Sequence, residues 1–297
     1  MSSPKHSRTC TPSLGIFANG LSACIALLLC SAVSLGVYAS NSEQRVNPEL
    51  LELQQKQKPI LRKLGTRVYA TEFIGYSNHG FIEGDDGIIV IDGGWFPTTT
   101  QRAITELREF TDKPVAAIIY THLHLDHFGG IGPIMANQPT DIPVYGPAGW
   151  EHWVTRLLRQ DRESILRRVY LQMGMLFPQG ENGTVGNGIG PSPIPEPNDP
   201  LSFPPTIDVD QTLDVVIAGV PLRIMPMEGD VTEHIWVWLP EDRILFSGDS
   251  PPHGVFPAVE TARFEIGRNP DEMLRAVETS LALQPEAIVP GHSRILR

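Results

Sequence analysis

The sequence predicts an α+β protein built as a four-layer αβ/βα sandwich, and three features of its 297 residues lead to that prediction. Short apolar runs of strand length occur in two groups, one in each half of the chain. An amphipathic stretch with helical spacing follows each group. Polar residues that can bind metals come directly after several apolar runs, as in sites held by a rigid sheet. Sheets that each bury one face under helices give this layered arrangement.

The first group of elements starts with a polar amphipathic pattern over residues 47–64, which predicts a helix packed outside the core. Apolar runs bounded by turn residues follow it. The predicted elements are strands at 68–70, 80–82, 87–91 and 115–120 and one helix at 98–110.

The second group begins after one long charged helix predicted over residues 150–176. Residues 178–205 contain eight prolines and five glycines, which predicts an extended loop. Asn269 before Pro270, with Glu272 three residues after Asn269, marks a helix start. The predicted elements are strands at 213–217, 221–225, 234–239, 244–246 and 287–289 and a helix from 269 to 283.

The N-terminal segment predicts export. Lys5 and Arg8 precede an apolar stretch at 21–37, and small residues precede a cleavage site after Ala39. We expect a signal peptide over residues 1–39, a periplasmic or secreted protein, and no stable membrane insertion after cleavage. An uncleaved membrane anchor is the alternative. All three cysteines lie within this segment, so the mature chain would have neither disulfides nor a thiolate nucleophile.

Composition limits the remaining possibilities. A net charge of −11 argues against a nucleic-acid partner, because phosphate-backbone binding needs a basic surface. We expect a helical extension at 40–64 followed by a catalytic domain at 65–297, whereas the oligomeric state is not predicted.

The strongest motif is Thr121-His122-Leu123-His124-Leu125-Asp126-His127, which follows the predicted strand at 115–120. His122 and His124 project to the same side of an extended chain, because side chains repeat every two residues. The chain then turns, so that Asp126 and His127 can face a neighbouring centre. Imidazole and carboxylate groups together suit Zn²⁺, Mn²⁺ or Fe²⁺.

Further ligand candidates follow other predicted strands. They are Glu228 and Asp230 after 221–225, Asp249 after 244–246, and His292 after 287–289. His234 lies near the same turn as Glu228 and Asp230, so the spacing leaves all three open as ligands.

These motifs in this order resemble the metallo-β-lactamase superfamily of hydrolases, and the hairpin at 81–92 is similar to its usual opening. The resemblance covers about residues 65–292 and implies a metallo-β-lactamase-like fold. It implies two ions, with Zn²⁺ expected and Mn²⁺ or Fe²⁺ as alternatives. His122, His124 and Asp230 would hold one ion, and Asp126, His127 and His292 the other. Asp249 would bridge them around a shared hydroxide, which makes Asp126 and Asp249 the catalytic candidates.

Within the superfamily the chain resembles the alkyl sulfatase-like branch. Residues 117–130 and the segment 175–190 are similar to that branch, and Asp230 is acidic where most relatives have histidine. The sequence departs from the branch at Asp249, where glutamate is usual, at Met173 and at Ala258. The C-terminal extension of alkyl sulfatases is also expected to be absent.

The resemblance suggests roles for residues beyond the metal ligands. Arg263 would hold an anionic leaving group, His253 would contact substrate, and Gly188 would offer its backbone N–H to an oxyanion. Asp92 would orient a ligand histidine by accepting its second ring N–H. His79 is a further candidate for a substrate contact at the opening hairpin.

Three functions remain open on this evidence. The first is a metal-dependent hydrolase of alkyl sulfates or similar small anionic esters. The second is another superfamily hydrolase, such as a lactonase, a thioesterase or a β-lactamase. The third is a truncated paralogue that binds metal without turnover.

Overall fold

The computed structural model describes residues 46–136, 138–139, 141–156, 162–186, 189–197, 203–251 and 269–297. The predicted signal peptide and the residues Gly188, His253 and Arg263 lie outside these ranges. Within them, no helix is long and apolar enough to cross a membrane.

Two sheets form the centre of the compact unit over Arg45–Arg297. The seven-stranded sheet has the order β1-β2-β3-β4-β5-β6-β7, and the five-stranded sheet has the order β12-β11-β10-β9-β8. The strands of the first sheet are β1 (Ile60–Leu64), β2 (Val68–Glu72), β3 (Gly80–Glu83), β4 (Ile88–Ile91), β5 (Val115–Ile119), β6 (Val144–Pro147) and β7 (Ile207–Val209). Those of the second are β8 (Leu213–Ile217), β9 (Val220–Pro226), β10 (Ile235–Leu239), β11 (Ile244–Gly248) and β12 (Ala287–Pro290).

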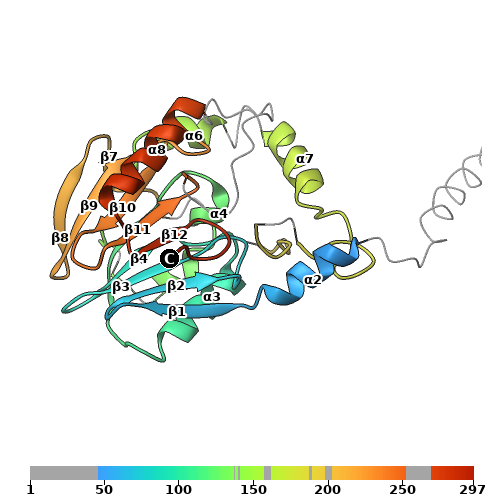
Figure 1. Ribbon diagram of the computed structural model, residues 1–297, viewed down its shortest axis with the longest axis horizontal. Coiled ribbons are helices and arrows are strands. Elements are labelled where there is room, and N and C mark those ends of the chain that lie inside the picture. Colours follow the sequence, from blue (N-terminus) through green and yellow to red (C-terminus); the bar gives the residue numbers. More distant parts are fainter. Residues whose placement is uncertain are drawn as a thin grey trace, which may run out of the picture. The chain divides into compact units, whose positions relative to one another are not determined.

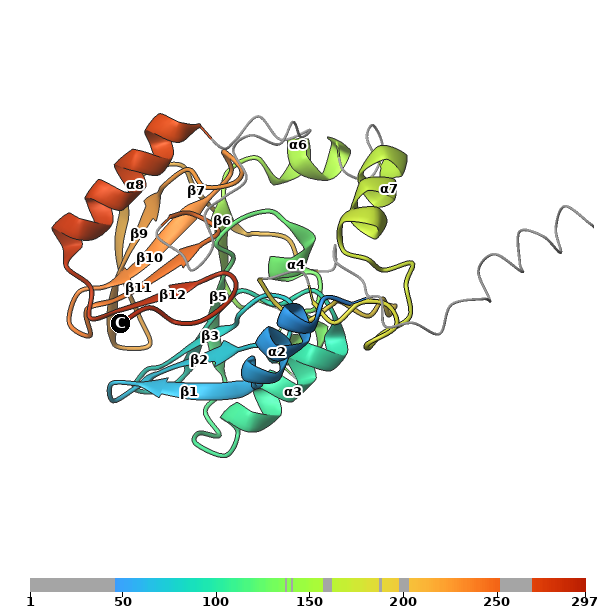
Figure 2. The same cartoon turned by 45° about the vertical axis from the view of Figure 1, so that its right-hand side comes forward.

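The helices are α2 (Pro48–Lys56), α3 (Pro97–Leu107), α4 (Leu125–Phe128), α5 (Gly132–Met135), α6 (Trp150–Thr155), α7 (Arg162–Gln172) and α8 (Pro270–Leu283). Among them, α3, α5 and α6 pack on the outer face of the seven-stranded sheet and α8 on that of the five-stranded sheet. Figures 1 and 2 show α8 along the five-stranded sheet and α3 along the seven-stranded sheet. The expected four-layer αβ/βα sandwich is therefore confirmed.

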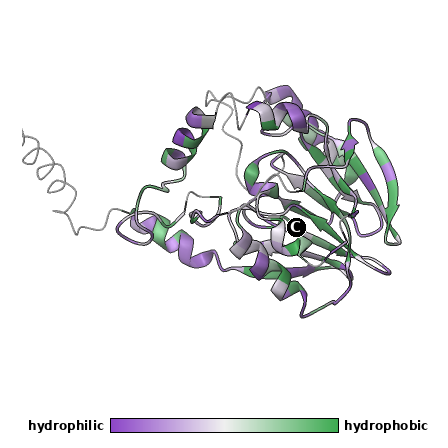
Figure 3. Ribbon diagram, turned by 180° about the vertical axis from the view of Figure 1, so that it is seen from behind, coloured by the Kyte–Doolittle hydropathy of each residue, from purple (hydrophilic) through white to green (hydrophobic). Residues whose placement is uncertain are grey.

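Three apolar clusters fill the layers. One lies between the sheets and joins residues such as Ile89 and Ile119 to Ile224 and Phe246. A second packs the seven-stranded sheet against α3, α5 and α6, and a third packs the five-stranded sheet against α8. The strands consequently carry most of the hydrophobic colouring in Figure 3. Burial of these side chains, at roughly 25 cal/mol per Å² of apolar area, is the main force that holds the two sheets together.

Two sequence-based assignments are wrong in part. The helix expected over 47–64 ends at Lys56, and Ile60–Leu64 forms edge strand β1, paired antiparallel with β2. Pro59 lacks the N–H that a continuing helix would need. Within the helix expected over 150–176, the described residues form α6 and α7, and residues 157–161 lie outside the described ranges. The helix α7 ends before Gly174, whose φ of +64° no longer fits a right-handed helix.

Two short strands were missed. β6 ends in the turn residues Gly146-Pro147, and β7 is interrupted by Asp208 and follows Pro204-Pro205, so neither gives a continuous apolar run. They extend the sheet through parallel pairing with β5 and with each other. The extended loop expected at 178–205 contains only isolated bridges within its described residues.

Strand direction decides where the site forms. β4 and β5 run parallel, as do β11 and β12, so the carboxyl ends of each pair meet at one edge. Asp92, the segment after Ile119, Asp249 and the residues after Pro290 follow these four ends. Binding sites commonly form at such carboxyl edges.

Candidate metal centre

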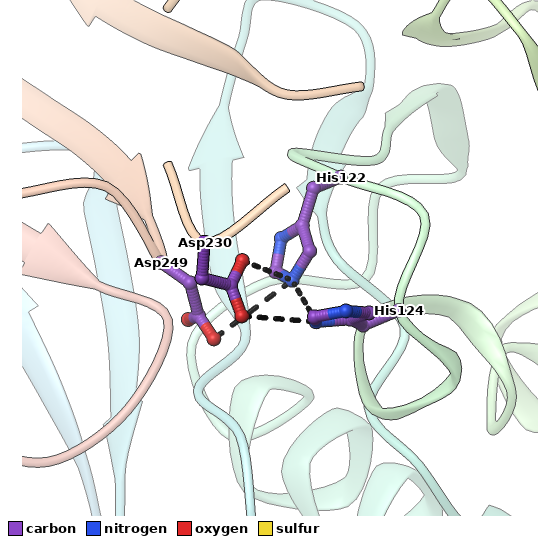
Figure 4. Close-up of side chains that lie close together, drawn as sticks. All are labelled: His122, His124, Asp230 and Asp249. Carbon is purple, nitrogen blue, oxygen red and sulfur yellow. Dashed lines mark hydrogen bonds and ion pairs between the residues drawn. The ribbon is translucent and has the colours of Figure 1, made fainter. Parts of the chain in front are cut away.

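The first cluster of potential ligands contains His122, His124, Asp230 and Asp249, whose ligand atoms all lie within 4.8 Å of one another. His124 Nδ1 is 3.2 Å from Asp230 Oδ2, and His122 Nε2 is 3.2 Å from His124 Nδ1. Figure 4 shows the four side chains converging, His122 and His124 from one loop and Asp230 and Asp249 from two others. The side chains that the sequence assigned to the first ion are thus adjacent.

The second cluster contains Asp126, His127 and His292, again within 4.8 Å of one another. His292 Nε2 is 3.2 Å from Asp126 Oδ2, and the Nε2 atoms of His127 and His292 are 3.4 Å apart. Asp126 and His127 lie on the single turn of α4, whereas His292 follows β12. The set expected for the second ion is therefore also adjacent.

Asp249 connects the two clusters. Its Oδ2 is 3.1 Å from His292 Nε2 and 3.8 Å from His122 Nε2, and its Oδ1 is 3.6 Å from His127 Nε2. This position between the two sets agrees with the bridging role that the resemblance implied for Asp249.

The outer nitrogens of three histidines are held by neighbouring polar groups. Asp92 Oδ2 is 2.8 Å from His127 Nδ1, and it also accepts a hydrogen bond from the Thr121 hydroxyl. His292 Nδ1 donates to the Tyr76 carbonyl at 2.8 Å, and His122 Nδ1 lies 3.1 Å from the Thr121 hydroxyl. Partners of this kind fix the ring tautomer and direct Nε2 toward an ion. Asp92 therefore has the place expected of it.

The structure distinguishes between the alternatives at the turn after β9. Asp230 joins the first cluster, whereas neither Glu228 nor His234 belongs to a ligand group among the described residues. His234 Nε2 accepts a hydrogen bond from the Asp249 backbone N–H at 3.0 Å, and its ring stacks on His122. His234 thus supports two candidate ligands, His122 and Asp249, from behind.

The lack of a side chain at Gly248 allows the His234 ring to lie against the backbone before Asp249. The φ of Gly248 is +51°, and an added Cβ would lie 2.6 Å from His234 Nε2 and 2.8 Å from the Thr121 hydroxyl. The glycine in Ser247-Gly248-Asp249 is therefore required by both backbone conformation and space.

The donor set fits divalent cations. Imidazole nitrogens and carboxylate oxygens are common ligands of zinc and related metals. Asp249 Oδ1 is buried and has no hydrogen-bond partner among the described residues, an arrangement that costs free energy unless another positive group meets it. A cation would supply that group.

Electrostatics in the metal-free protein also favour added positive charge. Burial disfavours protonation of His292, but the charges of Asp249 and Asp126 dominate and raise its pKa well above the usual value. Burial likewise opposes protonation of His127, yet Asp126, Asp249 and Asp92 together raise its pKa to about 10. Because a metal ion replaces those protons, we expect metal binding to release protons.

Two neighbouring histidines behave in the opposite way. Burial lowers the pKa of His79 to about 4, with a further contribution from His127. Burial also lowers the pKa of His234 to about 4, against the raising effect of Asp230 and Asp249. Both rings are therefore neutral at physiological pH.

These shifts predict that the metal-free protein is most stable near pH 6.5. His79 and His234 have folded pKa values below the unfolded value, so their stabilisation is lost as pH falls from about 6.5 toward 4, on the order of 3 kcal/mol each. His127 and His292 have raised folded values, so their stabilisation is complete below about 6.5 and is lost as pH rises.

Urea unfolding in chelator at about pH 4.5, 6.5 and 9 measures this dependence. Saturating metal should remove the alkaline loss, because the ligand histidines are then neutral in the folded state. A free energy of unfolding that rises steadily from pH 6.5 to 9 in chelator would contradict the assignment.

Comparison with known proteins gives the context of this site. A family model described as the metallo-beta-lactamase superfamily matches residues 74–292. A linear primary-alkylsulfatase of Pseudomonas sp. (strain ATCC 19151) is 24% identical over 219 residues, which are 72% of this chain and 40% of that protein. An (R)-specific secondary-alkylsulfatase of Pseudomonas sp. is 26% identical, over 70% of this chain and 32% of that protein.

A solved structure agrees with these sequence matches. The stereoselective inverting sec-alkylsulfatase Pisa1 from Pseudomonas sp. has a TM-score of 0.71 and 22% identity, over 87% of this chain and 42% of that one. At that identity the likeness concerns the fold. This chain spans about two fifths of that structure and less than half of each of the two curated relatives.

Proposed function

Because the chain belongs to the metallo-β-lactamase superfamily, we propose that it is a metal-dependent hydrolase of alkyl sulfates or similar small anionic esters. The observation that supports this most directly is the position of Asp249 between two adjacent clusters of ligand side chains. The similarity to alkylsulfatases indicates the ester class.

The metal requirement follows from the residues present. Two divalent cations in these clusters would lower the pKa of a bound water and stabilise negative charge that develops on the substrate. We assign His122, His124 and Asp230 to one ion, Asp126, His127 and His292 to the other, and Asp249 to both. Zn²⁺ is the proposed metal, and elemental analysis distinguishes it from Mn²⁺ and Fe²⁺.

The protein's own groups would organise the reaction in a buried site. Asp92 and the Tyr76 carbonyl keep the His127 and His292 rings oriented. His234 holds the Asp249 backbone, so that its carboxylate remains between the clusters. On the substrate side, we assign the anionic leaving group to Arg263, with His253 and Gly188 as further contacts.

The test is sulfate release from a medium-chain alkyl sulfate such as octyl sulfate. We expect activity that chelator abolishes and Zn²⁺ restores, and that is absent from an Asp126→Asn variant purified in the same way. Lactone, thioester and nitrocefin substrates are assayed in parallel. Turnover of one of these without sulfate release would overturn the sulfatase proposal, and metal binding without any turnover would overturn catalysis itself.

A further inference from the structure

The segment Tyr76–His79, between β2 and β3, contacts the loops that carry the second cluster. All four residues are buried, with exposed fractions of 7% for Tyr76, 1% for Ser77, 4% for Asn78 and 0% for His79. Three of them are polar, which is costly in a protein interior unless each polar group has a partner. Their partners show what the segment does.

Asn78 makes three hydrogen bonds to the loop around His292. Its backbone N–H donates to the Gly291 carbonyl at 2.7 Å. Its side-chain amide donates to the carbonyls of Pro290 at 2.9 Å and Ser293 at 3.0 Å. The amide therefore joins the carbonyl before Gly291 to the carbonyl after His292, which fixes the path of the chain through His292.

The neighbours of Asn78 reach the same cluster. The Tyr76 carbonyl accepts the His292 Nδ1–H bond, and the two rings meet edge to face with centroids 4.8 Å apart. The Ser77 hydroxyl donates to the backbone carbonyl of Asp126. Two of the three ligands in the second cluster are thus held directly by this segment.

His79 connects to His127, the third ligand candidate of the second cluster, through Thr100 and Gly93. Its Nε2 is 3.1 Å from the Thr100 hydroxyl, which donates to the Gly93 carbonyl at 2.7 Å. The Gly93 N–H in turn donates to the His127 carbonyl at 2.5 Å. His79 therefore lies behind the site, and its expected contact with substrate at the opening hairpin is incompatible with complete burial.

The first cluster has different supports. His122 lies against Thr121, and His234 holds Asp249 and stacks on His122. Within the described ranges, the side chains of Ser77, Asn78 and His79 bond to Asp126, to the loop around His292, and to Thr71 and Thr100, not to the ligand candidates of the first cluster. Tyr76–His79 therefore supports the second cluster directly. The Thr121–Asp92 hydrogen bond links His122 to His127 and is independent of this segment.

We propose that Tyr76–His79 is a positioning element for the second metal ion, with Asn78 as its central positioning residue. This inference rests on the proposed two-metal function. Loss of the Asn78 amide would let the His292 loop relax. It would therefore weaken binding of the second ion and leave binding of the first ion unchanged. If the segment only contributed to protein stability, its loss would lower the affinity for both ions equally or for neither.

The experiment measures zinc stoichiometry and affinity by equilibrium dialysis for the full chain. We expect two equivalents for the wild type. Asn78→Ala should retain the first ion and bind the second about 10- to 100-fold more weakly, the range typical for partners of metal ligands. Ser77→Ala removes only the contact to Asp126 and should also lower the affinity for the second ion. This variant is decisive if Asn78→Ala does not fold.

Asn269→Ala is the matched control. Asn269 caps α8, where its side chain accepts a hydrogen bond from the Asp271 N–H. Its loss should cost about 1 kcal/mol of stability and leave both ions unchanged. Wild-type protein with two ions, together with unchanged affinities in Asn78→Ala and Ser77→Ala, would overturn the positioning role alone. Wild-type protein that binds fewer than two ions would overturn the two-metal proposal as well.

Discussion

Replacing Asp249 with asparagine is expected to reduce hydrolysis by more than about 100-fold and to lower the metal content. Asp249 is within 4 Å of His122 and His127 as well as His292, so it reaches both clusters. Asparagine retains the shape but loses the charge and one ligand oxygen. Loss of a partner of a ligand already costs about 10- to 100-fold, and loss of a ligand shared by two ions should cost more.

The Asp249→Asn measurement combines turnover with elemental analysis. Asp242→Asn provides the control, because the Asp242 carboxylate is also largely buried and pairs with Arg67 at 2.8 Å in the turn between β10 and β11. That variant should lose stability while keeping metal and activity. Full activity and two ions in Asp249→Asn would exclude a bridging role.

Most of the candidate ligand set could be predicted because its signals are local. His122, His124, Asp126 and His127 lie within six residues, directly after a strand whose apolar run is easily recognised. His292 likewise follows a short buried strand. Strand ends meet at one edge of a sheet, so the adjacency of these residues follows from the layered fold.

The hydrogen bonds that hold the candidate ligands in place could not be predicted in the same way. Asn78 and Pro290 are 212 positions apart, and their hydrogen bond leaves no pattern in either segment. The choice of Asp230 over Glu228 and His234 likewise depends on the path of the turn after β9, whose spacing allows all three. Sequence therefore indicated the candidate ligands, whereas the hydrogen bonds that orient their side chains required tertiary structure.

Gly291→Ala is expected to abolish binding of both ions and to reduce hydrolysis by more than about 100-fold, beyond the range typical for loss of a ligand's partner. An added Cβ would lie 2.1 Å from Asp249 Oδ1 and 2.7 Å from His127 Cε1, far inside van der Waals contact. The backbone of Gly291 cannot easily retreat, because its N–H donates to Gly248 and its carbonyl accepts from Asn78, both at 2.7 Å. Asp249 or His127 must therefore move, at a stability cost of about 1–3 kcal/mol.

Gly132→Ala separates this local clash from a general effect of adding a methyl group. Nothing lies within 4 Å of a Cβ at Gly132, which is the first residue of α5, so the variant should keep both ions. Its stability should fall slightly, because alanine before Pro133 disfavours the helical conformation. Zinc stoichiometry, sulfate release and urea unfolding are compared for both variants. If Gly291→Ala bound two ions as tightly as Gly132→Ala, the loop at His292 would have to be more compliant than its hydrogen bonds indicate, and the close packing of Asp249 against it would not be needed for the metal site.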